Sequence, residues 1–197
     1  MVQTLDLTKR YAYAEYLKWA DDVRCELIEG FIKLFPAPRL SHARVSRSIF
    51  RHLDAIVSKN KGYCEVFHAP FDVRFPKNGE TDNDKIYTVV QPDICVVCDP
   101  SKLDEAGCCG APDMIVEIFS PSTGVRDTHE KFMLYEGAGV KEYWIVYPKD
   151  KAVHVFTLNN DGKYGNGQVY EQKEKIPVHI FDKYSIDYDD IFVEFKY

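Results

Sequence analysis

The chain has 197 residues, of which 45% are hydrophobic, 14% aromatic and 28% charged, and its formal net charge is −6 at pH 7. This composition excludes a disordered chain, and the length predicts one domain, residues 1–197, with a substantial core. No apolar run approaches the roughly 20 residues of a membrane helix, and the first residues lack the regions of a signal peptide. We therefore expect a cytoplasmic protein with no membrane partner. The acidic charge argues against a protein that simply coats DNA.

The first third of the chain predicts two helices and several strands. Residues 6–19 have the spacing of an amphipathic helix, and residues 25–35 indicate a turn at Gly30 that leads into a strand. Ser41 is a plausible N-cap for a helix that runs to about Ser58. Its buried stripe is predicted at helical spacing, at Val45, Ile49, Leu53 and Ile56. Residues 64–75 are typical of a strand that Pro70 interrupts.

The middle and the end of the chain predict further strands around one helix. Residues 86–98 and 112–119 are nearly continuous apolar runs, as expected of strands covered on both faces, with a small-residue loop at 99–111. Asp127 resembles the N-cap of a helix that Gly139 ends. Residues 141–147 and 152–158 predict paired strands, with shorter ones at 168–171 and 191–195. This order predicts an α/β (α+β) fold with a central mixed sheet flanked by helices.

The six cysteines do not form a recognisable metal motif. Cys95 and Cys98 have C-x-x-C spacing, but positions i and i+3 of a strand point to opposite faces. We therefore expect reduced thiols, and treat a zinc protein as the weaker alternative.

Two acids in the apolar strand regions are candidate ligands for a hard cation. Asp93 and Glu117 are separated by enough chain to lie on neighbouring strands. Two carboxylates with waters form a shell that Mg²⁺ accepts, and a bound cation would activate water and neutralise phosphate charge. Asp113 is a competing acid, but it would lie about 13 Å from Glu117 along one strand. We therefore assign Asp93 to the site and Asp113 to the entry of the strand.

A lysine on the following helix is predicted to point toward these acids. Lys131 shares a helical face with Leu134, Tyr135 and Ala138. An amine on such an inward face is either half of a structural ion pair or a group that positions water. The pattern leaves both readings open.

Basic residues concentrate in the segment from Phe31 to Gly62. This segment contains seven basic residues and one acidic residue. Arg44, Arg47 and Arg51 follow an i, i+3, i+7 pattern on one helix. Such a face fits phosphate contacts, although a solvated helix face is the more common use. His42 begins the inward stripe of the same helix, where a core histidine is more common than a catalytic one.

An ordered set of motifs resembles a known family. It comprises Glu26–Gly30, His42, Gln91-Pro92-Asp93, the run from Val116 to Thr123, Asp127, Lys131, Tyr135 and Glu142-Tyr143-Trp144. Between about Glu26 and Phe156 the chain is similar to the putative restriction endonuclease family of the PD-(D/E)XK nuclease superfamily.

The resemblance implies a restriction-endonuclease-like fold and a nuclease dependent on Mg²⁺ or Mn²⁺. It implies that Asp93, Glu117 and the carbonyl of Ile118 hold the metal. The usual lysine two residues after the second acid is Phe119 here, so the resemblance implies that Lys131 replaces it. Glu26 and His42 are additional candidates at the site.

Two functional hypotheses follow. The first is a metal-dependent endonuclease that hydrolyses DNA, with Arg44, Arg47 and Arg51 on phosphates; cleavage of both strands of a duplex would favour a homodimer. The second is a noncatalytic module of the same fold for nucleic-acid binding or regulation. Phe119 at the usual lysine position and the acidic net charge motivate the second hypothesis.

Overall fold

The computed structural model describes residues 5–19, 23–35, 37–60, 62–119 and 124–193. Within them, the main sheet is mixed and has the strand order β12-β11-β10-β9-β6-β3. Its strands are β3 (Glu65–His68), β6 (Ile94–Val97), β9 (Met114–Ile118), β10 (Glu142–Tyr147), β11 (Ala152–Thr157) and β12 (Gln168–Tyr170). β9 runs parallel to β10 and antiparallel to β6. The α+β architecture with a mixed sheet flanked by helices is therefore confirmed.

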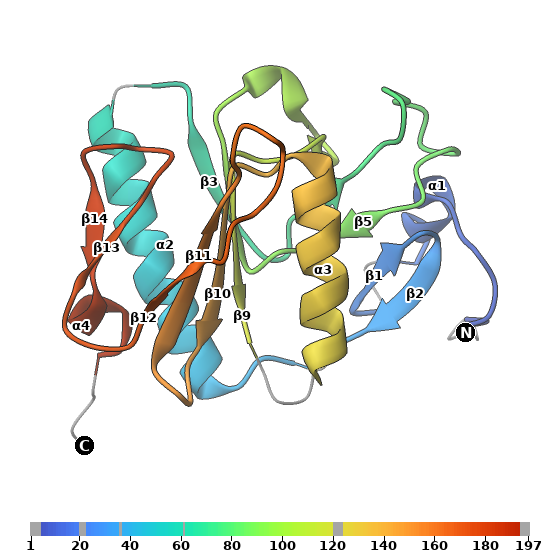
Figure 1. Ribbon diagram of the computed structural model, residues 1–197. Helices are drawn as coiled ribbons and strands as arrows, with labels where there is room; N and C mark the ends of the chain where they lie inside the picture. The colour runs from blue at the N-terminus through green and yellow to red at the C-terminus, as the bar shows by residue number, and fades with distance from the viewer. Residues whose placement is uncertain (1–4, 20–22, 36, 61, 120–123, 194–197) are drawn as a thin grey trace.

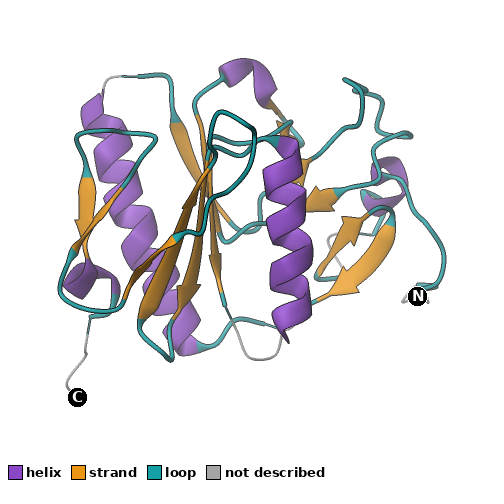
Figure 2. Cartoon of the chain, viewed as in Figure 1, coloured by secondary structure: helices purple, strands orange, loops and turns teal. Residues whose placement is uncertain are grey.

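Two long helices cover the two faces of this sheet (Figures 1 and 2). The first, α2 (Leu40–Asn60), buries the predicted stripe against Met114, Val116 and Ile118 of β9. The second, α3 (Gly124–Ala138), packs Tyr135 on the opposite face, against Ile115. The alternation along β9 explains why this strand reads as a continuous apolar run, since both faces are covered. It also turns Glu117 toward the side of α3.

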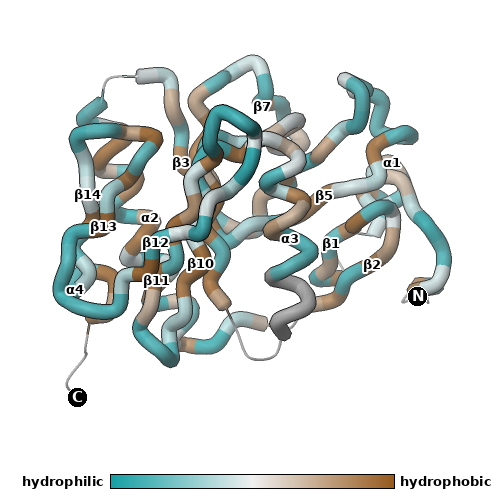
Figure 3. Tube along the Cα trace, in the orientation of Figure 1, coloured by the Kyte–Doolittle hydropathy of each residue, from teal (hydrophilic) through white to brown (hydrophobic). Residues whose placement is uncertain are grey.

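A second sheet lies beside the main one and has the strand order β2-β1-β5-β4-β8-β7. Its strands are β1 (Cys25–Ile28), β2 (Phe31–Leu34), β4 (Val73–Arg74), β5 (Val89–Val90), β7 (Leu103–Asp104) and β8 (Gly107–Cys109). The β1–β2 hairpin turns at Glu29 and Gly30, both with positive φ, which confirms the predicted turn. Figure 3 shows hydrophobic segments along the central strands and hydrophilic ones at the outer loops.

The predicted helix at 6–19 is wrong for most of its length. Only α1 (Tyr13–Tyr16) is helical. Backbone hydrogen bonds of this segment go to other parts of the chain: the Tyr11 amide donates to the Gly30 carbonyl, and that of Tyr13 donates to Ile86. Tertiary hydrogen bonds have thus replaced the helical ones.

Two predictions for the middle of the chain also need correction. The apolar run 86–98 is not one strand, because β5 and β6 belong to different sheets and are separated by residues 91–93. The expected loop 99–111 contains a short 3₁₀ helix, η2 (Pro100–Lys102), and the β7–β8 hairpin. β8 pairs with the edge of β4, so this segment of small residues forms hydrogen bonds within a sheet instead of a free loop.

Helix α3 begins earlier than predicted, because its backbone is already helical at Gly124, three residues before Asp127. The strand predicted at 191–195 is wrong at its start, since Ile191 ends α4 (Tyr188–Ile191); residues 194 and 195 lie outside the described part. The hairpin of β13 (Lys175–Pro177) and β14 (Ser185–Asp187) precedes α4. Together with α4 it completes the core on the side of α2.

The expectation of reduced thiols is wrong for two of the six cysteines, because a disulfide joins Cys64 and Cys98. Cys95 and Cys98 do point to opposite faces, as strand geometry requires: Cys95 packs in the core under α3 and Cys98 in the core under α2. Cys98 can pair with Cys64 because both side chains pack against the core under α2. None of the helices in the described residues is long and apolar enough to cross a membrane.

Candidate active site

The structure brings Asp93 and Glu117 to the same edge of the main sheet. Asp93 directly precedes β6, and Glu117 is the penultimate residue of β9. Because β6 and β9 are antiparallel, with Ile94 opposite Val116, the start of one strand meets the end of the other. The Ile118 amide donates to Asp93 Oδ2 at 2.7 Å. Both carboxylates therefore line one site, although Asp93 enters a strand rather than leaving one.

Lys131 reaches this site from α3, on the helical face that the sequence predicted. Its Nζ lies 2.8 Å from Glu117 Oε1 and 2.8 Å from Glu26 Oε1. The hydroxyl of Tyr135, one helical turn later, donates to Glu117 Oε1 at 2.6 Å. All three ionisable side chains are mostly buried, with exposed fractions of 14% for Lys131, 17% for Glu117 and 6% for Glu26. The amine is thus shared between two carboxylates that come from different sheets.

The pKa values of Glu117, Lys131 and Tyr135 are all shifted by burial and by the neighbouring charges. Burial raises the pKa of Glu117 to about 7, with Lys131 opposing the rise and Asp93 and Glu26 adding to it. Burial alone would lower the pKa of Lys131, but the charges of Glu117 and Glu26 outweigh it and raise that pKa. Burial and the neighbouring Glu117 charge also raise the pKa of Tyr135. Lys131 therefore stays protonated, and Glu117 is the group that exchanges a proton near neutrality.

Glu26 is held in place by a buried network that the sequence analysis did not include. The Gln91 amide donates to Glu26 Oε1 at 2.8 Å, and the Gln91 side chain donates to Asp72 Oδ1 at 2.9 Å. Tyr13 and Tyr16 donate to the two oxygens of Asp72. The sequence feature that could have indicated this network is the position of Gln91, two residues before Asp93. Asp72 gave no comparable signal, because its partners are distant in the chain.

His42 contacts the site instead of packing in the core. Its Nε2 lies 3.0 Å from Asp93 Oδ1, and its side chain is 17% exposed. Its Nδ1 is buried and has no hydrogen-bond partner within the described part of the chain. His42 lies one helical turn before the core stripe of α2. At this level the neighbouring strand has ended, so the histidine faces the edge of the sheet.

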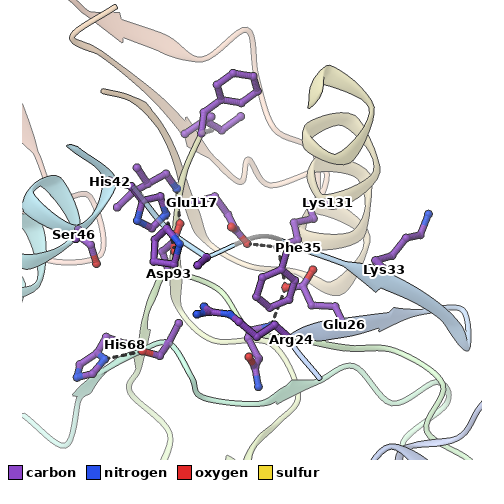
Figure 4. A pocket seen from close by; sticks show the side chains of 18 of the residues that line it. Arg24, Glu26, Lys33, Phe35, His42, Ser46, His68, Asp93, Glu117 and Lys131 are labelled. Atoms are coloured by element: carbon purple, nitrogen blue, oxygen red, sulfur yellow. Dashed lines mark hydrogen bonds and ion pairs between the residues drawn. The ribbon is translucent and has the colours of Figure 1, made fainter. Parts of the chain in front are cut away.

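A cavity of about 480 Å³ between α2 and the β1–β2 hairpin is lined by Glu26, His42, Asp93, Glu117 and Lys131. Figure 4 shows His42 and Ser46 on one side, Glu26 and Phe35 on the other, and Glu117 and Asp93 between them. Asp113 is not part of it. Its carboxylate accepts from the Cys98 amide and pairs with Lys141, which confirms its assignment to the strand entry.

The three arginines of α2 lie near this cavity but not against the acids. Arg47 lines it, and all three of Arg44, Arg47 and Arg51 line a second cavity of about 390 Å³. Arg47 and Arg51 are exposed and Arg44 is half-buried. This second cavity is completed by Lys151 and by residues 191–193. Basic side chains of α2 therefore lie beside the candidate active site.

The donors at the sheet edge fit a hard cation. Within the described residues no group of three or more His, Cys, Asp and Glu side chains has the arrangement of a metal site. Asp93 and Glu117 provide two carboxylates, and Ile118, whose amide donates to Asp93, lines the same cavity. Two carboxylates with a carbonyl and waters are an all-oxygen set that suits Mg²⁺ or Mn²⁺ and excludes a thiolate-rich zinc site.

Residues 13–188 match the model of the Uma2 family, described as putative restriction endonuclease. The chain belongs to this family. The matched residues include every candidate named above, and the Uma2 family supports nuclease function in general terms.

The chain is also similar to two other proteins. The uncharacterized protein slr1290 of Synechocystis sp. is 27% identical over 157 residues, which are 76% of this chain and 75% of the relative. The crystal structure of a putative nuclease belonging to DUF820 from Anabaena variabilis superimposes with a TM-score of 0.71 at 19% identity, covering 92% of this chain and 97% of that one. The structural likeness confirms the restriction-endonuclease-like fold.

Proposed function

We propose that this chain is a single-domain, metal-dependent endonuclease that hydrolyses phosphodiester bonds in DNA. The observation that carries the proposal is the convergence of Asp93, Glu117 and Lys131 at one sheet edge, in a cavity that leads to exposed arginines. An all-oxygen site beside a cationic surface is the combination that a nuclease needs. Membership of the Uma2 family supports the same function.

Asp93, Glu117 and the Ile118 carbonyl would hold Mg²⁺ or Mn²⁺. When bound, the ion supplies charge neutralisation at the phosphate and lowers the pKa of a coordinated water. The Ile118 amide and His42 fix the two oxygens of Asp93, so this carboxylate is oriented before any substrate arrives. Tyr135 does the same for Glu117. Fixed carboxylates lower the reorganisation that a catalytic site must undergo.

Lys131 acts as a hydrogen-bond donor rather than as a general base. Its raised pKa keeps it protonated, so it has no lone pair with which to accept a proton. A protonated amine beside Glu117 can orient the attacking water and stabilise negative charge on the phosphate. Glu26 keeps the amine in position through its 2.8 Å ion pair.

Exposed arginines extend the proposed site along the nucleic acid. Arg47 and Arg51, with Arg44 beside them, would contact phosphates and position the substrate without reading its sequence. Double-strand cleavage by this chain would then use two copies in a homodimer, each with one site.

The test is cleavage of linear and plasmid DNA with Mg²⁺ or Mn²⁺ by the wild type and by Asp93→Ala and Lys131→Ala. Each substitution should lower the rate by about a hundredfold or more, because each removes a group at the reacting phosphate. Asp182→Ala and Lys183→Ala are matched controls, since both side chains are exposed in the connection between β13 and β14. Undiminished cleavage by both site variants would refute the assignment.

The noncatalytic alternative gives a different set of results. The closed ion pairs of Lys131 with Glu26 and Glu117 are also what a structural role would produce. A wild type that binds DNA, cleaves nothing and shows no heat of Mn²⁺ binding by calorimetry would favour that alternative. Mn²⁺ binding that Asp93→Ala abolishes would support the nuclease.

A further inference from the structure

One face of α2 opens the cavity instead of filling it. His42, Ala43, Ser46, Arg47 and Phe50 line it, and they recur at i, i+1, i+4, i+5 and i+8. This face is distinct from the core stripe of the same helix. Because Ala43 and Ser46 are small, the helix leaves room beside the carboxylates, with the half-buried Phe50 ring at one end.

The opposite wall is apolar and partly exposed. Leu34 and Phe35, at the end of the β1–β2 hairpin, line the cavity, and Leu34 is 59% exposed. The guanidinium of Arg24 lies over the Phe35 ring, 5.5 Å from its centroid. Figure 4 shows Phe35 and Arg24 across the pocket from His42 and Ser46. Phe119 and Ile118 add further apolar surface next to Glu117.

This lining does not match the outside of an intact duplex. A duplex presents phosphates, sugars and base edges, which would leave these aromatic and aliphatic side chains without apolar partners. An unstacked base presents two apolar faces, and stacking on aromatic side chains is the usual way in which proteins hold one. A cavity of about 480 Å³ is within the range of roughly 300–1,000 Å³ typical of small-molecule sites.

We infer that this cavity holds an unstacked nucleobase next to the scissile phosphate, so that the substrate is single-stranded or locally melted DNA. The inference rests on the proposed nuclease function and specifies its substrate class. The base would stack on Phe35, whose ring is already paired with Arg24, and extend toward Ser46 and Phe50. Such a base would be drawn from a strand whose phosphate lies at Asp93 and Glu117.

The charges at the mouth of the cavity agree with this placement. Exposed Arg24 lies on the hairpin side and exposed Arg47 on the α2 side. Phosphates that flank the bound nucleotide would pass between these two cations. A backbone that follows a cationic groove while its base stacks on a ring is the usual arrangement for single-strand binding.

The first experiment measures binding of a fluorescein-labelled 20-nucleotide strand, and of the same sequence as a duplex, by anisotropy in EDTA, which prevents hydrolysis. Phe35→Ala should weaken binding of the single strand by about 5- to 150-fold, the equivalent of ~1–3 kcal/mol for one stacked base, and leave the duplex affinity nearly unchanged. Phe35→Leu keeps an apolar side chain without a ring and should lose an intermediate amount. Phe31→Ala is the matched control, because Phe31 is 40% exposed on the same hairpin and does not line the cavity.

A second variant tests the space itself. Ser46→Phe adds a ring on the α2 wall and should exclude the base, so that single-strand binding falls while duplex binding persists. Ser58→Phe is its control, since Ser58 is exposed near the other end of α2. Circular dichroism and thermal unfolding of each variant identify any loss of folding, and the Leu variant retains the test if the Ala variant unfolds.

Equal weakening of both DNA forms by Phe35→Ala, or an unchanged single-strand affinity in both Phe35→Ala and Ser46→Phe, would overturn the inference. These outcomes are separable from failure of the proposed function. Metal-dependent cleavage without selective effects at Phe35 refutes the base site and leaves the nuclease standing. Selective loss of single-strand binding in a protein that cleaves nothing supports the base site and refutes the catalytic role.

Discussion

Lys131→Met tests the electrostatic account of the site most directly. The substitution replaces the amine with an apolar side chain of similar length and leaves Glu26 and Glu117 without the cation that lies 2.8 Å from each. Removal of one partner from a buried ion pair costs about 3–5 kcal/mol, because the remaining charge is left buried. We expect a loss of this size in the free energy of unfolding near neutral pH.

The loss should depend on pH in a defined direction. Burial raises the pKa of Glu117 from 4.5 to about 7 in the folded wild type, so the stability linked to this group is present below about pH 4.5 and is lost as the pH rises through about 7. At about 1.4 kcal/mol per pKa unit, this rise corresponds to ~3 kcal/mol. Without Lys131 the pKa of Glu117 rises further, and each added unit costs the variant about 1.4 kcal/mol more at alkaline pH.

Urea unfolding in EDTA at about pH 5.5 and about pH 8.5 measures both quantities. The difference between wild type and Lys131→Met should be larger at the higher pH. Lys183→Met, an exposed lysine, should change the free energy by less than about 0.5 kcal/mol at either pH. A difference of the same size at both pH values would show that titration of Glu117 does not cause the pH dependence. A difference below about 1 kcal/mol at both would show that the ion pair contributes no more than a solvent-exposed one.

Three other substitutions test separate parts of the molecule. Arg47→Ala should weaken DNA binding and reduce the slope of log Kd against log salt concentration by about one, because one phosphate contact is lost. Lys59→Ala, at the far end of α2, should leave this slope unchanged. If Arg47→Ala and the wild type have equal slopes, Arg47 does not contact the DNA. Glu142 accepts from two N–H donors in the core, so Glu142→Gln, with one acceptor oxygen fewer, should lower the free energy of unfolding by about 1–3 kcal/mol, and unchanged urea midpoints would contradict this. Cys64→Ser should cost about 2–4 kcal/mol relative to the oxidised wild type, and alkylation of an unreduced sample followed by mass spectrometry should find Cys64 and Cys98 protected.

The parts of the fold that the sequence predicted well are those in which periodicity and burial agree. The stripe of α2 recurs at helical spacing and is buried throughout, and β9 and β10 are apolar because helices cover both faces of the sheet. Glu117 was identifiable for the same reason, since a carboxylate within such a strand requires partners. Lys131 was identifiable because its helical face also carries Tyr135, which packs against the sheet.

The parts that were missed depend on partners distant in the chain. Residues 6–19 have helical spacing, but the amides of Tyr11 and Tyr13 donate to the carbonyls of Gly30 and Ile86, and no local pattern predicts such distant partners. The division between β5 and β6 falls at the Gln91–Asp93 segment, where the chain passes from one sheet to the other. The role of Glu26 also depends on this junction, because it brings a residue of β1 to an amine on α3. Sequence spacing alone cannot place two sheets side by side.

The proposed displacement of the lysine would also account for the apolar wall of the cavity at position 119. In the superfamily pattern that the chain resembles, the lysine lies two residues after the second acid, which here is Phe119. In the proposed site the amine comes from α3, so position 119 would need no charge. The Phe119 ring lines the cavity next to Glu117, and its centroid lies 5.0 Å from that of the Tyr147 ring. Phe119→Lys would therefore restore the usual position of the lysine while placing a charge in an apolar wall. If the cavity holds a base, this substitution should weaken single-strand binding even though it adds a positive charge, because a strongly hydrated ammonium would replace part of the apolar wall that the base contacts.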